Sequence, residues 1–152
     1  KENMALFLIG GPSKHFYWDS KKVLEQIKNI SQEFKFKKLL ITTSRRTPID
    51  FINEYKKLKI KNIKLYEDTK IINDWLDKKI VKVKNIWVTN DSYSMLIEAI
   101  ASGAYTDTLE LKIKKKSKLS REINLVKKKI KNKITIPNEA ERVAKFIQKI
   151  WF

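Results

Sequence analysis

The sequence contains no cysteine, a single histidine and only three glycines. Without cysteine the chain can form neither disulfides nor thiolate metal sites, as is typical of proteins in a reducing compartment. Neither the GxGxxG dinucleotide motif nor the GxxxxGK[ST] phosphate-binding loop is present. No stretch of about 18 apolar residues could cross a bilayer as a helix, and no signal-peptide pattern is visible. These absences favour a cytoplasmic protein.

The length and the apolar content are those of one globular domain. At 152 residues and 42% hydrophobic residues, the chain can bury a substantial core. The first predicted strand begins only a few residues after Lys1, and no repeat or low-complexity linker interrupts the chain. We therefore expect residues 1–152 to form a single domain that belongs to a longer protein.

The formal charge of +17 is carried almost entirely by lysine, since only four of the 34 basic residues are arginine. Surfaces that recognise nucleic acids tend to use arginine, whereas a lysine excess is typical of biased genome composition. Residues 112–133 contain eleven basic residues against the single acid Glu122. We interpret this run as a solvated basic face, with a nucleic-acid site as the alternative.

Residues 85–103 contain the most informative pattern. The apolar run Ile86–Val88 predicts a buried strand, Asn90–Ser92 a turn and helix cap, and Gly103 the end of the helix that follows. Apolar residues cover most of that helix. The remaining polar stripe, at helical spacing, consists of Ser94, Glu98 and Ser102. Because such a helix is largely buried, we expect this stripe to face a cleft or a partner.

Two further strands are followed by polar loops. Ala5–Ile9 leads into Gly10–Lys14, where paired glycines would let another group approach the backbone. Phe36–Thr43 leads into Ser44–Pro48, whose hydroxyls and two arginines suit an anionic ligand. In this loop Thr47 is predicted to cap a helix, with Pro48 in its first position and Asp50 completing a capping box. Tight or capped turns without a ligand remain the alternatives for both loops.

The order of the remaining elements predicts the fold class. Helices are expected after Asp19 or Ser20 and over 51–58, 71–79, 119–130 and the residues after Asn138, with strands over 63–66 and 108–113. Alternating apolar strands and helices are typical of an α/β, Rossmann-like parallel sheet with helices on both faces. Ligands of such sheets lie beyond the carboxyl ends of the strands, at the point where the strand order reverses.

The segment His15–Trp18 combines the only histidine with three aromatic residues. These side chains could cover a ligand or simply pack against the core. A single histidine lacks the partners that a metal site or a catalytic triad would need.

Three segments together resemble a known family: GGPSKH at 10–15, TTSRRTP at 42–48 and VTNDSYSMLIEAIASG at 88–103. They are similar to the plant mitochondrial fission protein family and its bacterial homologues, some of which are labelled nucleoside-diphosphate-sugar epimerases. That family resembles the GT-B glycosyltransferases, which bind a nucleotide-sugar between two Rossmann-like halves. This chain would correspond to the C-terminal, donor-binding half. With no GxGxxG motif, the residues do not favour an epimerase.

The resemblance implies a nucleotide-sugar substrate, no cofactor and no metal, because GT-B sites use a helix dipole and basic residues instead. The missing N-terminal half would bind the acceptor, so this chain alone would not catalyse. Glu98 would accept hydrogen bonds from the ribose. By the resemblance, the ligands of the phosphates and nucleotide would be Gly10, Gly11, Ser13, Ser44, Arg45, Ser92, Ser94 and Met95. The polar loops add Lys14, Thr43, Arg46 and Asp91 as further candidate ligands.

Two other functions stay open. An interaction module without catalysis would use the basic helix over 119–130 against an acidic partner or an anionic membrane surface, at the inner face of a membrane. Nucleic-acid binding is the third candidate. We rank it last because no aromatic residue interrupts residues 112–133 to stack on bases.

Overall fold

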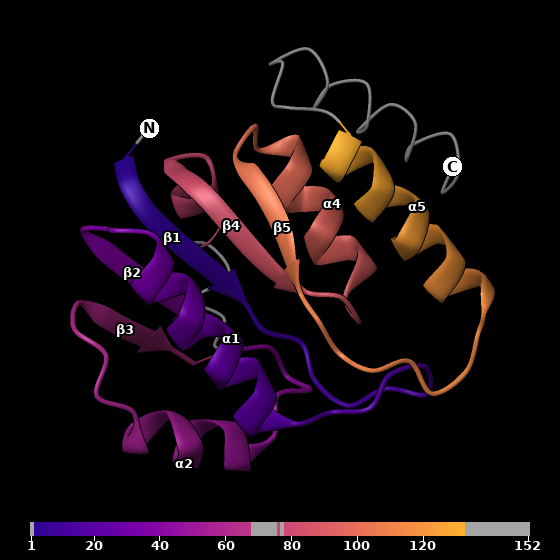
Figure 1. The fold of residues 1–152 in the computed structure, drawn as a ribbon, viewed down its shortest axis with the longest axis horizontal. Coiled ribbons are helices and arrows are strands. Elements are labelled where there is room, and N and C mark those ends of the chain that lie inside the picture. The colour runs from indigo at the N-terminus through magenta and orange to yellow at the C-terminus, as the bar shows by residue number, and fades with distance from the viewer. Residues whose placement is uncertain (1, 68–75, 77, 133–152) are drawn as a thin grey trace.

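The computed structural model describes residues 2–67, 76 and 78–132. Its five strands form one sheet in the order β3-β2-β1-β4-β5, and every neighbouring pair is parallel (Figure 1). The strands are β1 (Glu2–Leu8), β2 (Lys38–Thr42), β3 (Ile63–Tyr66), β4 (Val83–Thr89) and β5 (Tyr105–Leu109). The helices are α1 (Ser20–Glu33), α2 (Ile49–Lys57), α4 (Tyr93–Ala101) and α5 (Lys118–Asn132). The predicted Rossmann-like α/β fold is confirmed.

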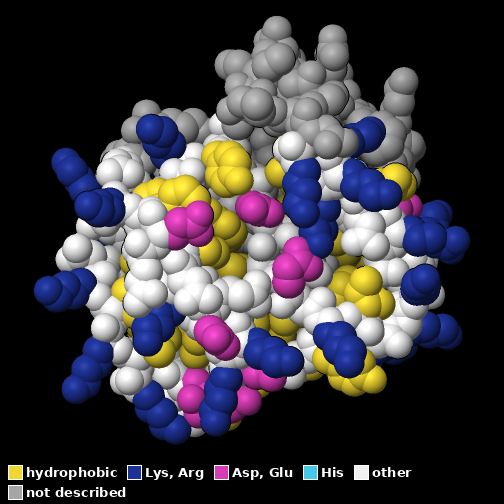
Figure 2. Space-filling model, in the orientation of Figure 1, with side chains coloured by type: hydrophobic (Ala, Val, Ile, Leu, Met, Phe, Trp, Pro, Cys, Tyr) yellow, Lys and Arg dark blue, Asp and Glu magenta, His cyan; other side chains and the backbone are white. Residues whose placement is uncertain are grey.

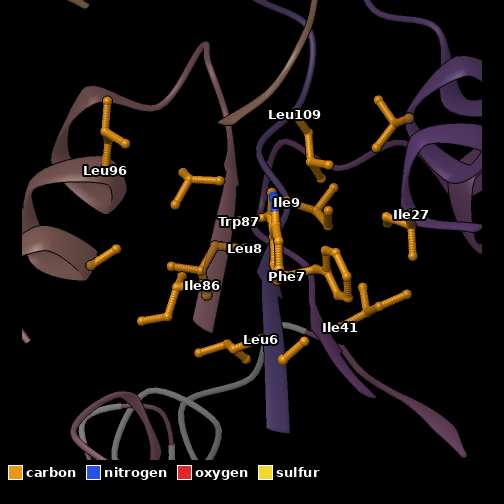
Figure 3. Packing of buried hydrophobic residues seen from close by; sticks show 14 of the residues in the cluster. Leu6, Phe7, Leu8, Ile9, Ile27, Ile41, Ile86, Trp87, Leu96 and Leu109 are labelled. Atoms are coloured by element: carbon orange, nitrogen blue, oxygen red, sulfur yellow. The ribbon is translucent and has the colours of Figure 1, made fainter. Parts of the chain in front are cut away.

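Strand β1 lies at the centre of the sheet, between two layers of helices. Figure 3 shows Phe7 of β1 on the side of Ile27 from α1, and Leu8 on the side of Leu96 from α4. All four side chains are buried. Successive strand residues point to opposite faces, so a strand covered on both faces must be apolar throughout. The continuous run ALFLI therefore marks the central strand.

The fifth strand lies earlier in the chain than its sequence pattern predicts. The expected range was 108–113, whereas β5 pairs with β4 from Tyr105 to Leu109. The period-2 pattern continues through Leu111 and Ile113, but those residues leave the sheet. Ile113 instead forms an isolated antiparallel bridge with Phe16. Alternation alone does not show which neighbour a strand will pair with.

Of the two predicted helix caps, at Asp19 and at Thr47, the structure confirms one. Asp19 caps α1, because its carboxylate accepts a hydrogen bond of 3.1 Å from the Lys22 amide. The cap at Thr47 is wrong: α2 begins at Ile49, and Pro48 occupies the N-cap position. The hydroxyl of Thr47 is bound elsewhere, to the loop after β1. Asp50 does not complete a capping box with Thr47, and its carboxylate accepts a hydrogen bond from the Ser20 hydroxyl at 2.9 Å.

Other predicted elements stand as follows. The basic helix expected over 119–130 is confirmed as α5. Of the helix expected over 71–79, the structure describes only Leu76, Lys78 and Lys79, which are helical. The last helix, expected after Asn138, lies outside the described residues. Across residues 2–67, 76 and 78–132, no helix has both the length and the apolar character of a membrane span.

Candidate functional site

The strand order places the reversal point between β1 and β4. From β1 the chain moves outward to β2 and β3, then returns to the other side of β1 as β4 and continues to β5. Figure 1 shows the ends of β1 and β4 side by side, and the two strands pair directly. The chain leaves these two strands for helices on opposite faces of the sheet, α1 and α4, and such a reversal point is where ligands of this kind of sheet bind.

A buried carboxylate joins the three loops at this edge. The Asp91 side chain, in the turn after β4, is 0% exposed. Its Oδ2 atom accepts a hydrogen bond of 3.2 Å from the Gly11 amide in the loop after β1. The same oxygen lies 2.9 Å from Nη2 of Arg46, in the loop after β2. We call Gly11, Arg46 and Asp91 the clasp. The predicted convergence of the three loops is therefore found.

Additional hydrogen bonds fasten the loops after β1 and β2 to each other. Arg46 Nη1 donates to the Gly11 carbonyl at 3.3 Å. The Thr47 hydroxyl donates to the Gly10 carbonyl at 2.6 Å and accepts from the Ser44 amide at 2.9 Å. This use of Thr47 explains why it does not cap α2. The edge is thus a connected hydrogen-bonded unit rather than three independent loops.

The two glycines allow the loops to approach this closely. A Cβ atom at Gly11 would lie 2.0 Å from the carbonyl oxygen of Arg46, and one at Gly10 would lie 2.3 Å from Asp91 Oδ2. Both distances are far below van der Waals contact. The group that approaches the glycine backbone is therefore part of the protein itself, the carboxylate of Asp91 and the backbone of Arg46.

The amino terminus of α4 opens onto the same edge. Ser92 is the N-cap residue, with extended backbone, but its side chain makes no capping hydrogen bond to the described residues. The first-turn amides of Ser94 and Met95 follow it, where N–H groups have no partner within a helix. Beside them, Asp91 Oδ1 is buried and has no hydrogen-bond partner among the described residues. This end of the helix can accept a polar ligand.

The polar stripe of α4 lies largely on the exposed side of the helix, and its facing a cleft or a partner stays a prediction. Ser94 and Glu98 are exposed and Ser102 is half-buried, whereas Tyr93 and Leu96 are buried. The helix ends at Ala101, and Gly103 follows the C-cap residue Ser102 with a φ of 80°, the left-handed conformation that glycine favours just past a helix end.

The remaining predicted residues lie around this edge without joining the clasp. The Ser13 hydroxyl accepts hydrogen bonds from the amides of His15 and Phe16, at 3.3 and 3.2 Å, and shapes its own loop. Lys14 and Arg45 are exposed. Thr43 and Ser44 are half-buried, and the Thr43 amide donates to the Tyr66 carbonyl at the end of β3.

Two residues that hold the site together were not predicted as part of it. The Gly10 amide donates to the buried hydroxyl of Thr89 at 2.8 Å. The Asn90 side chain accepts from the Leu111 amide at 2.9 Å and donates to its carbonyl at 3.2 Å. Both residues directly follow the apolar run of β4, and that position is the signal that could have identified them. In the part of the chain that the structure describes, no three histidine, aspartate or glutamate side chains gather as metal ligands.

The parallel sheet, whose strand order reverses between β1 and β4, and its alternating helices define a Rossmann-like α/β protein. The model of the family described as Mitochondrial fission ELM1 matches residues 1–149, and the chain belongs to this family. The family resemblance read from the three loop motifs is thereby confirmed. A search of curated proteins finds no match to the chain.

Proposed function

We propose that this domain binds a nucleoside diphosphate or nucleotide-sugar at the crevice between β1 and β4, as the donor-binding half of a GT-B-like glycosyltransferase. The observation that carries the proposal is the amino terminus of α4, which has no side-chain cap and lies at the reversal point of the sheet. Both the strand order and the helix end favour a phosphate-bearing ligand at this position.

The diphosphate would bind the first-turn amides of Ser94 and Met95. A helix amino terminus carries roughly half a positive elementary charge, which stabilises an anion. The exposed cations of Lys14 and Arg45 would add to this attraction. Arg46 is paired with Asp91 and so offsets the buried negative charge that would otherwise repel a phosphate.

The clasp then shapes the crevice rather than contacting the phosphates. The Gly11 amide already donates to Asp91, and Arg46 is bound to both Asp91 and the Gly11 carbonyl. The phosphates would therefore contact the first-turn amides of α4 and the exposed side chains of Lys14 and Arg45. Asp91 Oδ1, which is buried without a partner among the described residues, could accept a hydrogen bond from a ligand hydroxyl or a bound water.

Glu98 would bind the ribose. It is exposed on α4, five residues beyond Tyr93 and so about 7.5 Å along the helix axis. A carboxylate accepts hydrogen bonds at both oxygens and can hold two adjacent hydroxyls. Glycosyl transfer would require the acceptor-binding half of a longer protein.

Isothermal titration calorimetry with UDP, GDP, ADP and CMP tests this proposal. We expect saturable binding of one of these nucleotides. Glu98→Ala should weaken that binding by about tenfold to a hundredfold, because hydrogen bonds to a charged acceptor are lost. The matched control is Glu25→Ala, which removes another exposed carboxylate, from α1.

Two results would contradict the proposal: failure of all four nucleotides to bind, or equal effects of the two variants. The alternative interaction module predicts no nucleotide binding, together with partner binding that weakens steeply as salt rises and does not change in Glu98→Ala.

A further inference from the structure

The loop after β1 continues beyond the crevice as an extended segment beside the chain that follows β5. The Tyr17 amide donates to the Lys112 carbonyl, and the Lys114 amide donates to the His15 carbonyl, both at 2.8 Å. Phe16 and Ile113 form the antiparallel bridge between these bonds. In Figure 1 the two segments run side by side below the sheet. This pairing brings an aromatic residue into a basic run that has none of its own.

The Tyr17 ring lies among exposed lysines. The ammonium nitrogens of Lys114 and Lys112 lie 5.2 and 6.0 Å from the ring centroid, and the residue is 52% exposed. Residues 112–121 contain six basic residues and no acidic one. We call Tyr17 and these six exposed cations the basic ridge: Lys112, Lys114, Lys115, Lys116, Lys118 and Arg121.

Charge alone does not single out a site on this molecule. Figure 2 shows lysine and arginine side chains on the left, right and lower parts of the face in view. The basic ridge differs because it combines a dense run of cations with an exposed aromatic ring. Glu110, the nearest acid in the sequence before the run, is already bound to Lys127 and to the side chains of Asn90 and Thr108. Glu110 is therefore held by partners outside the ridge.

We propose that the basic ridge binds single-stranded nucleic acid, with the lysines on the phosphates and one base stacked on Tyr17. Stacking on an exposed aromatic ring within a cationic groove or ridge is the general mode of sequence-tolerant single-strand binding. The lysines beside the Tyr17 ring are exposed, so their ammonium groups can leave the ring and bind phosphate oxygens instead. The proposal does not depend on the nucleotide crevice, since it uses none of the clasp residues.

The observations favour nucleic acid over an anionic membrane. A helix that binds a membrane surface presents a broad apolar face beside its basic one. In the described part of α5, Leu125 is the one exposed large hydrophobic side chain, whereas Ile123 and Val126 are buried. An isolated leucine gives little insertion, whereas an aromatic ring between lysines suits a base and its flanking phosphates.

Fluorescence anisotropy of a labelled oligothymidine of about 15 nucleotides, titrated with the whole chain, tests the role of the ring. Tyr17→Ala should lower the affinity about tenfold, because one stacked base is lost. Tyr17→Phe keeps the ring and should bind like the wild type. Circular dichroism melting would show that both variants fold. Unchanged affinity in Tyr17→Ala would overturn the proposal.

The salt dependence tests the cations. Between about 50 and 200 mM salt, Lys112→Ala/Lys114→Ala should reduce the slope of log K against log salt concentration by about 1.4, since each phosphate contact contributes about 0.7 on a single strand. The control Lys56→Ala/Lys59→Ala removes the same charge from α2 and the residues after it, and should leave the slope unchanged. Equal slopes for the two pairs would overturn the proposal. So would binding to vesicles containing phosphatidylserine without binding to the oligonucleotide.

Discussion

At Gly11 a side chain of any size would collide with the loop after β2. A Cβ atom there would lie 2.0 Å from the Arg46 carbonyl oxygen and 2.4 Å from its carbon, both backbone atoms that cannot move aside cheaply. We expect Gly11→Ala to lower the free energy of unfolding by about 2–3 kcal/mol through overpacking. Urea denaturation measures this loss. Lys14→Ala, an exposed change in the same loop, should stay within about 0.5 kcal/mol of the wild type.

The hydroxyl of Tyr105 should make the stability of the protein depend on pH in the alkaline range. Partial burial first, and then the negative charges of Asp107 and Glu33, raise the pKa of its hydroxyl above the ordinary value of 10.0. The folded state thus holds the phenolic proton more tightly than the unfolded chain. This contribution to stability is fully present below pH 10 and is lost as the pH rises through the folded-state pKa.

Phenolate absorbance during an alkaline titration measures this pKa, with Tyr105→Phe identifying the signal. Asp107→Asn should move the Tyr105 transition to lower pH, because it removes one of the charges that disfavour the phenolate. A transition unchanged by Asp107→Asn would contradict the assignment.

Among the elements, the clasp is what connects the loop after β2 with the turn before α4. Arg46→Ala would remove one of the two partners of the buried Asp91 carboxylate. Asp91→Ala would remove the acceptor that the Gly11 amide and the Arg46 guanidinium share. We expect each change to cost about 1–3 kcal/mol. The double variant should cost less than the sum of the two, because the partners interact directly. Additive losses in urea denaturation would show that the pair is not coupled.

The packing of α5 can be tested by comparing a buried with an exposed residue of this helix. Ile123 belongs to the buried core and is 1% exposed, whereas Leu125 on the same helix is 53% exposed. Ile123→Ala should destabilise the protein by about 2–4 kcal/mol, through lost burial and the cavity left behind. Leu125→Ala should change stability by less than about 0.5 kcal/mol. Comparable losses would mean that α5 packs differently from this arrangement.

The sequence predicts a helix cap or a strand end correctly where residues nearby in the chain form the contact. The prediction fails where a segment far away in the sequence binds the same group. Asp19 caps α1 as its position implies, since the capping bond is formed within four residues. Thr47 has equally good local signals, yet its hydroxyl binds the Gly10 carbonyl, 37 residues away in the sequence. Ile113 likewise continues a strand pattern but pairs with Phe16 outside the sheet. These tertiary contacts leave no local mark in the sequence.

For the molecule as a whole, the fold and the location of the candidate site follow from the apolar strands. Runs that are apolar throughout imply a parallel sheet covered on both faces, and a parallel sheet directs its loops to one edge. The sequence could not show which polar groups at that edge are already bound to each other. The hydrogen bond between Gly11 and Asp91 spans 80 residues and depends on the register of β1 against β4.

The loop after β1 contributes to both proposed binding sites. Its first residues, Gly10 and Gly11, donate hydrogen bonds to Thr89 and Asp91 beside the proposed nucleotide site, and its later residues place Tyr17 beside the basic run after β5. Residues 112–133 contain no aromatic residue of their own, which by sequence alone disfavours nucleic-acid binding. The fold supplies that residue from another part of the chain.

Amide chemical-shift mapping by NMR, with the nucleotide that binds most tightly in calorimetry, would locate the nucleotide on the domain. We predict that the largest shifts fall on three segments at one sheet edge, Gly10–Lys14, Thr43–Arg46 and Asp91–Met95. Shifts confined to the basic ridge or to α5, or no shifts at saturating nucleotide, would contradict a nucleotide site at the crevice between β1 and β4.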